Sequence, residues 1–187
     1  PSVRYLKKYL REHPVDAVVT TGPPHSMHLI GLGLKKALGV KWIADFRDPW
    51  TEMFYYKHLS LTKASDRKHH RLEQQVLDSC DRVIAVSPPA NEKDFSFLAP
   101  CPASGLIVQG GRDEIASPAM VESMAHKLNQ QRNVDIDFAL IEDADHMYNN
   151  HLGDLYKVSG QYVISALQHR SPLQKRRGRR KKSDMED

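Results

Sequence analysis

Short apolar segments alternate with longer helix-like segments along most of this sequence, and this alternation restricts the fold more than any other feature. Five segments have the length and composition of buried β-strands, at residues 16–20, 41–46, 83–86, 105–109 and 135–141. The segments between and around them are predicted as helices, at residues 3–12, 26–38, 61–80, 118–131 and 153–169. Strands that alternate with helices of this length form right-handed βαβ units, whose strands are parallel. We therefore predict an α/β fold with one parallel sheet.

The positive charge of the chain is confined to its C-terminal tail. The sequence has 187 residues and a formal net charge of +4. Seven basic residues lie within residues 175–182 and three acidic residues follow them, so the rest of the chain is neutral. A neutral body does not fit a groove shaped for nucleic acid, and we predict no specific nucleic-acid partner. We predict a single domain over residues 1–170, followed by a disordered basic tail over residues 171–187.

The cysteine, hydrophobic and histidine content predicts a cytoplasmic protein without a cofactor. Cys80 and Cys101 are the only cysteines, so no disulfide framework is indicated and a reducing compartment is expected. No apolar run approaches the roughly 20 residues of a membrane span. None of the histidines has cysteine or carboxylate companions at metal-ligand spacing, and we predict no metal site. The sequence begins at Pro1 within an amphipathic pattern, which suggests a piece of something longer.

Polar residues gather where the first two predicted strands end. In a parallel α/β sheet, ligands lie beyond the carboxyl ends of the strands. Residues 22–26 (GPPHS) place backbone donors at the entrance of a helix, which is a natural position for an anion. Asp45, Arg47 and Asp48 lie close together in the next such segment, and they can hydrogen-bond a sugar or clamp a phosphate. The alternative is a turn in which Arg47 only neutralises its neighbours.

Residues 1–87 resemble the later part of the N-terminal domain of bacterial family 4 glycosyltransferases. The resemblance rests on TTGPPHSMHLIGLGLKKALGVKWIADFRDPW and RKHHRLEQQVLDSCDRVIAVSP. It implies a Rossmann-like fold that handles the acceptor of the transferred sugar. It also implies that the following residues bind substrate and face a cleft between two domains: Pro24, His25, Ser26, Asp45, Arg47 and Asp48. In that family a C-terminal domain holds most of the nucleotide-sugar donor, and the sequence that follows here does not resemble it.

An aspartate and a histidine follow the last two predicted strands. Asp113 comes shortly after residues 105–109, and His146 comes shortly after residues 135–141. Neighbouring parallel strands end at the same edge of the sheet, so the two side chains can form an acid–base pair. In such a pair the carboxylate orients the imidazole and stabilises its charge. The alternative is an exposed histidine in an acidic loop.

Residues 85–170 resemble the C-terminal part of a small α/β-hydrolase. The resemblance rests on SPPANEKDFSFLAPCPASGLIVQGGRDEIASP and IEDADHMYNNHL. In that family serine, aspartate and histidine follow in this order, which makes Asp113 the acid and His146 the base of a catalytic triad. The nucleophile motif G-x-S-x-G occurs nowhere in the sequence. Arg47 occupies about the place of the nucleophile, and Ser26 is expected one strand spacing too far away, roughly 4.8 Å more.

The two resemblances meet at residues 82–91 (RVIAVSPPAN), where both families have a strand of similar pattern. Joining two halves at an equivalent strand gives one Rossmann-like, three-layer domain with five parallel strands in the order 1-2-3-4-5. Its glycosyltransferase-like half spans residues 1–87 and its hydrolase-like half residues 88–170. Right-handed crossovers in this order place the connecting helices on one face of the sheet. Only the first and last helices would cover the other face, which predicts exposed apolar surface and self-association.

The favoured hypothesis is a fused or recombined scaffold without an intact active site. One alternative is an ester hydrolase of the α/β-hydrolase type that uses Asp113 and His146 with an unrecognised nucleophile. Another is a protein that binds a sugar or a nucleotide-sugar through its first half. A third is a non-catalytic interaction module that acts through the basic tail.

Overall fold

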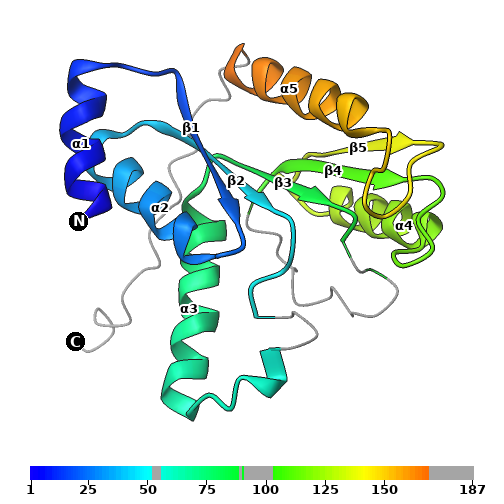
Figure 1. The fold of residues 1–187 in the computed structure, drawn as a ribbon, viewed down its shortest axis with the longest axis horizontal. Helices are drawn as coiled ribbons and strands as arrows, with labels where there is room; N and C mark the ends of the chain where they lie inside the picture. The colour runs from blue at the N-terminus through cyan, green and yellow to red at the C-terminus, as the bar shows by residue number, and fades with distance from the viewer. Residues whose placement is uncertain (52–55, 89, 91–102, 169–187) are drawn as a thin grey trace, which may run out of the picture.

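Five strands form one parallel sheet in the order β1-β2-β3-β4-β5, which confirms the predicted topology (Figure 1). The computed structural model describes residues 1–51, 56–88, 90 and 103–168. The predicted disordered tail lies outside the described residues, as does Cys101. The elements in chain order are α1 (Ser2–Glu12), β1 (Ala17–Gly22), α2 (Ser26–Leu38), β2 (Lys41–Phe46), η1 (Tyr56–His58), α3 (Lys63–Ser79), β3 (Arg82–Val86), β4 (Gly105–Gly110), α4 (Pro118–Asn129), β5 (Ile136–Ile141) and α5 (Leu152–Gln168).

Local sequence signals set the ends of several helices. Gly39 adopts the left-handed conformation at φ 68° and ends α2, which a residue without Cβ does at little cost. The side-chain oxygen of Thr62 caps α3 by accepting a hydrogen bond from the Ser65 backbone N–H at 3.2 Å. Pro118 opens α4, where its missing N–H leaves no hydrogen bond unmade. None of the described helices is long and apolar enough to cross a membrane.

The sequence prediction differs from the structure most clearly at two places in the first half. β1 continues to Gly22, two residues beyond the predicted end of the strand at residue 20, because Thr21 and Gly22 still pair with Asp45 and Phe46 of β2. The short helix η1 was not predicted. Both differences are local, and neither changes the order of the strands.

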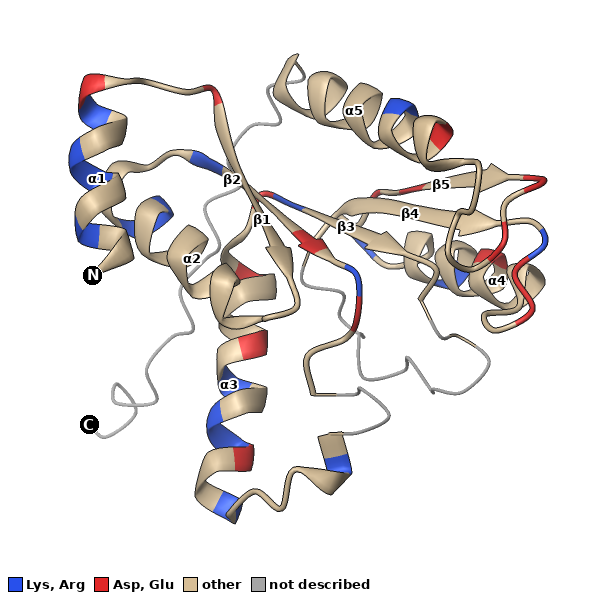
Figure 2. Cartoon of the chain, viewed as in Figure 1, with Lys and Arg blue, Asp and Glu red and all other residues tan. Residues whose placement is uncertain are grey.

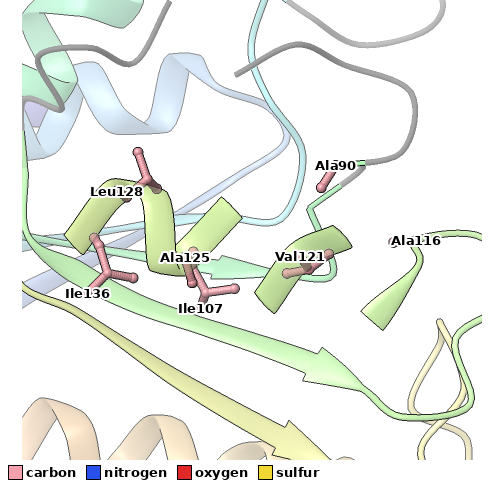
Figure 3. Close-up of a cluster of buried hydrophobic side chains, with 7 residues drawn as sticks. All are labelled: Ala90, Ile107, Ala116, Val121, Ala125, Leu128 and Ile136. Atoms are coloured by element: carbon pink, nitrogen blue, oxygen red, sulfur yellow. The ribbon is translucent and has the colours of Figure 1, made fainter. Parts of the chain in front are cut away.

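One face of the sheet carries α2, α3 and α4. Trp42, Ala44 and Phe46 of β2 pack beneath α2 and α3. Between α4 and the last two strands lies a second buried cluster, in which Ala125 and Leu128 of α4 face Ile107 and Ile136 (Figure 3). Ala116, in the turn after β4, belongs to this second cluster and is fully buried. The core therefore reaches into the turn that carries Asp113.

The other face of the sheet is covered less completely. Among the described residues, the helical side chains of the buried cluster there come from α5 alone: Leu155, Val158, Tyr162 and Val163. The first helix, which was expected on this face, packs against α2 instead (Figure 1), with Val3 close to Gly33. Tyr9 of that helix is 45% exposed and stacks on Tyr5 and His13. Val19 of β1 remains half exposed.

Gly31 is the point of closest approach between α2 and β2. A methyl group at Gly31 would overlap the indole ring of Trp42. Trp42 is fully buried and its Nε1–H donates to Thr20 Oγ1 at 2.8 Å, so the ring cannot move aside without breaking this bond. We expect Gly31→Ala to lower the free energy of unfolding by about 1–3 kcal/mol, measured by urea denaturation.

Gly160→Ala is the matched control for this prediction. Gly160 also lies within a helix, α5, but a methyl group there would meet no atom within 4 Å. The change should stabilise the protein by about 0.5–1 kcal/mol, because alanine favours a helix more than glycine does. A similar gain of stability in Gly31→Ala would contradict the packing of Trp42 against Gly31.

Candidate functional site

Asp113 and His146 meet at the carboxyl edge of the sheet. Asp113 lies in the turn after β4 and His146 in the turn after β5, two turns that carry several acidic residues (Figure 2). Nδ1 of His146 is 2.9 Å from Oδ2 of Asp113 and 3.1 Å from Oδ1. The Asp113 side chain is fully buried, whereas 30% of the His146 side chain is exposed. The arrangement is that of a buried acid holding an accessible imidazole.

Two glycines bring these turns together. A Cβ atom at Gly110 would overlap the carbonyl oxygen of Ala144, and one at Gly111 would overlap that of Glu142. Two hydrogen bonds hold the backbones together: Gly111 N donates to Ile141 O at 2.9 Å, and Arg112 N donates to Ala144 O at 3.0 Å. Because only glycine fits at such a distance, the Gly110-Gly111 pair determines how near Asp113 comes to His146.

The Asp113 carboxylate receives hydrogen bonds from groups on several elements. The donors are the backbone N–H groups of Ile115 (2.9 Å) and Ala116 (2.7 Å), the amide of Gln109 (3.0 Å), the imidazole of His146 and the hydroxyl of Ser87. Burial acts to raise the pKa of Asp113, but hydrogen bonds led by that from Ala116 N–H outweigh it and lower the pKa below its usual value. Asp113 therefore stays ionised at neutral pH and accepts a hydrogen bond from Nδ1–H, which leaves Nε2 of His146 as the basic nitrogen.

The Ser87 hydroxyl contacts the acid of the pair. Ser87 directly follows β3, has a positive φ of 45° and is buried. Its hydroxyl hydrogen-bonds the Asp113 carboxylate and lies 3.1 Å from the Tyr148 hydroxyl, which in turn donates to Val108 O at 3.2 Å. Sequence reasoning missed Ser87, Gln109 and Tyr148. Gln109 carried a signal that could have found it, as a polar residue in the otherwise apolar strand GLIVQ.

The predicted substrate residues of the first half lie at the carboxyl ends of β1 and β2. Pro24, Ser26, Arg47 and Asp48 are exposed there, and Asp45 is half-buried. Burial raises the pKa of Asp45, while a hydrogen bond from Thr21 and the charge of Arg47 act in the opposite direction. Neither β1 nor β2 pairs with β4 or β5, because β3 separates the two groups of strands. The structure thus places these residues at the same edge of the sheet as Asp113 and His146, on different strands.

His25 is buried, unlike the exposed residues beside it. Its Nε2 lies 2.9 Å from the carbonyl oxygen of Asp48, and its ring stacks on Trp50 with 5.6 Å between the ring centroids. His25 therefore joins the end of β1 to the end of β2. Its imidazole is engaged in this contact and supports the loop that carries Arg47 and Asp48.

His28 is a buried neutral histidine that the sequence reading did not single out as a site residue. Its Nδ1 is 2.9 Å from Thr20 Oγ1, its ring stacks on Phe46, and its side chain is fully buried. Burial, with a smaller contribution from His25, lowers the pKa of His28 from 6.5 to about 4. In the part of the chain that the structure describes, no group of three or more His, Cys, Asp or Glu side chains could hold a metal ion.

Fold and site together define an α/β protein in which one half of the sheet edge carries an Asp–His pair and the other half a loop cluster around Arg47. The sequence of residues 1–93 matches the model of Glycosyltransferase Family 4. An uncharacterized protein of Rickettsia prowazekii is 41% identical over 86 residues, which cover 44% of this chain and 36% of that protein. The predicted resemblance of the first half is therefore confirmed.

The chain shares its fold with a solved structure described as an α/β-hydrolase, which confirms the second predicted resemblance at the level of fold. A protein of unknown function from Agrobacterium tumefaciens, provisionally assigned as an alpha/beta hydrolase, superposes with a TM-score of 0.54 and 22% identity over 76% of this chain and 56% of that one. A serine hydrolase homologue from Coxiella burnetii gives a TM-score of 0.47 and 13% identity over 85% of this chain and 55% of that one. This chain thus spans little more than half the length of these structures.

Acid should destabilise the protein in two stages. The pKa of His28 is about 4 in the folded state against 6.5 when unperturbed, so its contribution is present above pH 6.5 and is lost as the pH falls towards 4. The pKa of Asp113 is lowered in the folded state, so its contribution is present above about pH 4 and is lost as the pH falls further. Hydrogen bonds from Asn149 also lower the pKa of Asp145, which contributes to the same stage. We expect Asp113→Asn to reduce the second stage and keep the first, in free energies of unfolding measured across pH.

Asp154→Asn is the control for the Asp113 variant. Asp154 also accepts a hydrogen bond from a histidine, His151 at 3.1 Å, but its side chain is 60% exposed. Exposed pairs contribute little to stability, so this variant should show both stages as the unmodified protein does. If Asp113→Asn kept the full slope of stability below pH 4, the low pKa of Asp113 would be refuted.

Proposed function

We propose that this chain is an α/β scaffold whose chemical competence is that of a general base, His146 held by Asp113, acting on small esters without a covalent intermediate. The observation that carries the proposal is the hydrogen bond between Nδ1 of the accessible imidazole and the buried carboxylate, at 2.9 Å. This bond leaves Nε2 free to take a proton. A histidine in this setting can abstract a proton near neutral pH.

The proposed reaction is hydrolysis by an activated water molecule. Nε2 of His146 accepts a proton from water as the water oxygen attacks the carbonyl carbon of the ester. The tetrahedral intermediate then collapses, the bond to the alcohol oxygen breaks, and the imidazolium returns its proton to the leaving alcohol. Asp113 remains ionised throughout and stabilises the imidazolium.

A water nucleophile is preferred to a serine because of what occupies the relevant positions. The Ser87 hydroxyl is buried and hydrogen-bonds the Asp113 carboxylate and the Tyr148 hydroxyl, and among the described residues no hydrogen bond joins it to His146. The loop after β2, where the hydrolase resemblance expects the nucleophile, carries Arg47. An arginine side chain is cationic at neutral pH and does not attack esters.

Hydrolysis of p-nitrophenyl acetate should depend on His146 and not on histidine in general. We expect His146→Ala to lower the rate above background by about 100-fold, the lower end of what a positioned general base contributes. His151→Ala is the matched control, because His151 also pairs with an aspartate but lies outside the site; its rate should be unchanged. Equal rates in the two variants would overturn the role of His146.

A fluorophosphonate probe tests the absence of a serine nucleophile. The probe labels serines that an imidazole activates, and water-based hydrolysis leaves no such residue. We expect no labelling of the intact chain and no burst of p-nitrophenol, measured by mass spectrometry and stopped-flow absorbance. Stoichiometric labelling of any serine would replace the proposal with a conventional serine hydrolase.

The second candidate function is binding of a sugar or nucleotide-sugar by the first half. It is supported by the family match over residues 1–93 and by the exposed polar groups of Ser26, Arg47 and Asp48 at one edge of the sheet. The buried contact of His25 with Trp50 and Asp48 would hold this loop in place before a ligand arrives. Guanidinium and carboxylate groups so arranged can bind phosphate and sugar hydroxyls.

Binding at this second site should raise the melting temperature. A nucleotide-sugar such as UDP-glucose at 100 times its Kd should stabilise the protein by about 2.7 kcal/mol, measured as a shift in Tm. Arg47→Ala should abolish the shift. Arg112→Ala, which removes an exposed arginine paired with Asp143 beside the other site, should retain it. An unchanged shift in Arg47→Ala would exclude Arg47 from binding.

A further inference from the structure

We infer that Gln109 is a positioning residue for the Asp113–His146 pair: its buried amide fixes Oδ2 of Asp113 and thereby keeps the His146 proton on Nδ1. This inference rests on the proposed role of His146 as a general base. Gln109 is the last residue but one of β4 and its side chain is fully buried. Burying a primary amide in an apolar strand costs free energy unless the amide forms hydrogen bonds there.

The Gln109 amide acts as a donor to three acceptors. Its Nε2 lies 3.0 Å from Oδ2 of Asp113, 3.0 Å from the carbonyl oxygen of Ala116 and 3.1 Å from that of Gly110. The two hydrogens of the amide must be shared among these acceptors. In contrast, Oε1 has no partner within the described part of the chain.

The orientation of this amide is fixed by electrostatics. Rotating it by half a turn would place Oε1 against two carbonyl oxygens and a carboxylate, so that oxygen would face oxygen at hydrogen-bond distance. The donor orientation is therefore the stable one, even though it leaves Oε1 unpaired. Oε1 of Gln109 thus has no hydrogen bond among the described residues, while Nε2 donates to the Asp113 carboxylate.

Gln109 connects the pair to the hydrophobic core. It donates to Ala116 O, while Ala116 N donates back to Oδ1 of Asp113 at 2.7 Å, which closes a ring of hydrogen bonds through the carboxylate. Ala116 is fully buried in the cluster that includes Val121 of α4 (Figure 3). Movement of Asp113 thus requires movement of a residue that the core holds.

The oxygen that Gln109 binds is the one closer to His146. Nδ1 is 2.9 Å from Oδ2 and 3.1 Å from Oδ1. Holding Oδ2 in one place keeps an acceptor opposite Nδ1, which favours the tautomer with the proton on Nδ1 and the lone pair on Nε2. Without Gln109 the backbone N–H groups of Ile115 and Ala116 still hold Oδ1, but Oδ2 loses this donor. The tautomer of His146 that carries its proton on Nε2 then becomes populated.

The inference is tested on the whole chain by two variants and one control. Gln109→Met keeps the length of the side chain and removes both donors. Gln109→Glu keeps the shape and can donate one hydrogen bond while it is protonated, but it repels Asp113 once it ionises. The control is Asn129→Ala, because the Asn129 amide is also part-buried and bonds the backbone of Ile136 at 2.6 and 2.7 Å, with no contact to the pair.

The first readout is the ¹⁵N NMR spectrum of the His146 ring, which reports the tautomer without requiring activity. We expect the Nδ1-protonated form to dominate in the unmodified protein and in Asn129→Ala, and a mixture of tautomers in Gln109→Met. Gln109→Glu should also show a mixture of tautomers at alkaline pH, where its carboxylate is ionised and repels Asp113. An unchanged His146 spectrum in Gln109→Met and Gln109→Glu would overturn the inference, whatever their stability.

The second readout is the rate of p-nitrophenyl acetate hydrolysis. We expect Gln109→Met to lower kcat about 10-fold with KM unchanged, as the loss of a hydrogen bond to a charged group would. A chain without esterase activity whose His146 spectrum still changes in Gln109→Met would refute the proposed function and support the role of Gln109. Activity that depends on His146, together with an unchanged His146 spectrum in Gln109→Met, would support the proposed function and refute the role of Gln109.

Discussion

A carboxylate can be buried in a protein only if other groups replace the water it loses, and the second half of this structure is arranged around that requirement at Asp113. Its donors come from the end of β3, from β4, from the turn that follows β4 and from the turn after β5. They lower the pKa of the carboxyl group despite burial, so the charge persists. The charge in turn fixes the ring of His146. Three strands are thereby tied together at their carboxyl ends by one side chain.

In the first half, two buried histidines pack at the same edge of the sheet. His25 bridges the ends of β1 and β2, and His28 fills the space beneath with Thr20 and Phe46. These contacts use imidazoles as structural groups, and the exposed residues Ser26, Arg47 and Asp48 lie above them. β3 belongs to both halves, since it pairs with β2 on one side and with β4 on the other. A shared strand is what allows a glycosyltransferase-like segment and a hydrolase-like segment to form one sheet.

This arrangement separates the parts that catalysis would need to combine. The Asp113–His146 pair follows β4 and β5, whereas the residues proposed to bind a sugar or nucleotide-sugar lie after β1 and β2. The serine that follows β3 hydrogen-bonds the acid of the pair and the Tyr148 hydroxyl. A general base that acts on water does not need a protein nucleophile beside it. For this reason the proposed chemistry is limited to what His146 can do with Asp113 behind it.

The sequence by itself determined the α/β class, the positions of most elements, the parallel strand order and the adjacency of Asp113 to His146. These follow from local periodicity and from the rule that parallel strands end at one edge. Only the tertiary structure decided the burial of His25 and His28, the packing of α1 on α2, and the roles of Gln109, Ser87 and Tyr148. Those depend on which groups face each other across strands that are far apart in sequence. Hydrogen-bond partners such as Ser87 and Asp113 carry no periodic signal, because their contact arises only when separate turns are brought together by the folded sheet.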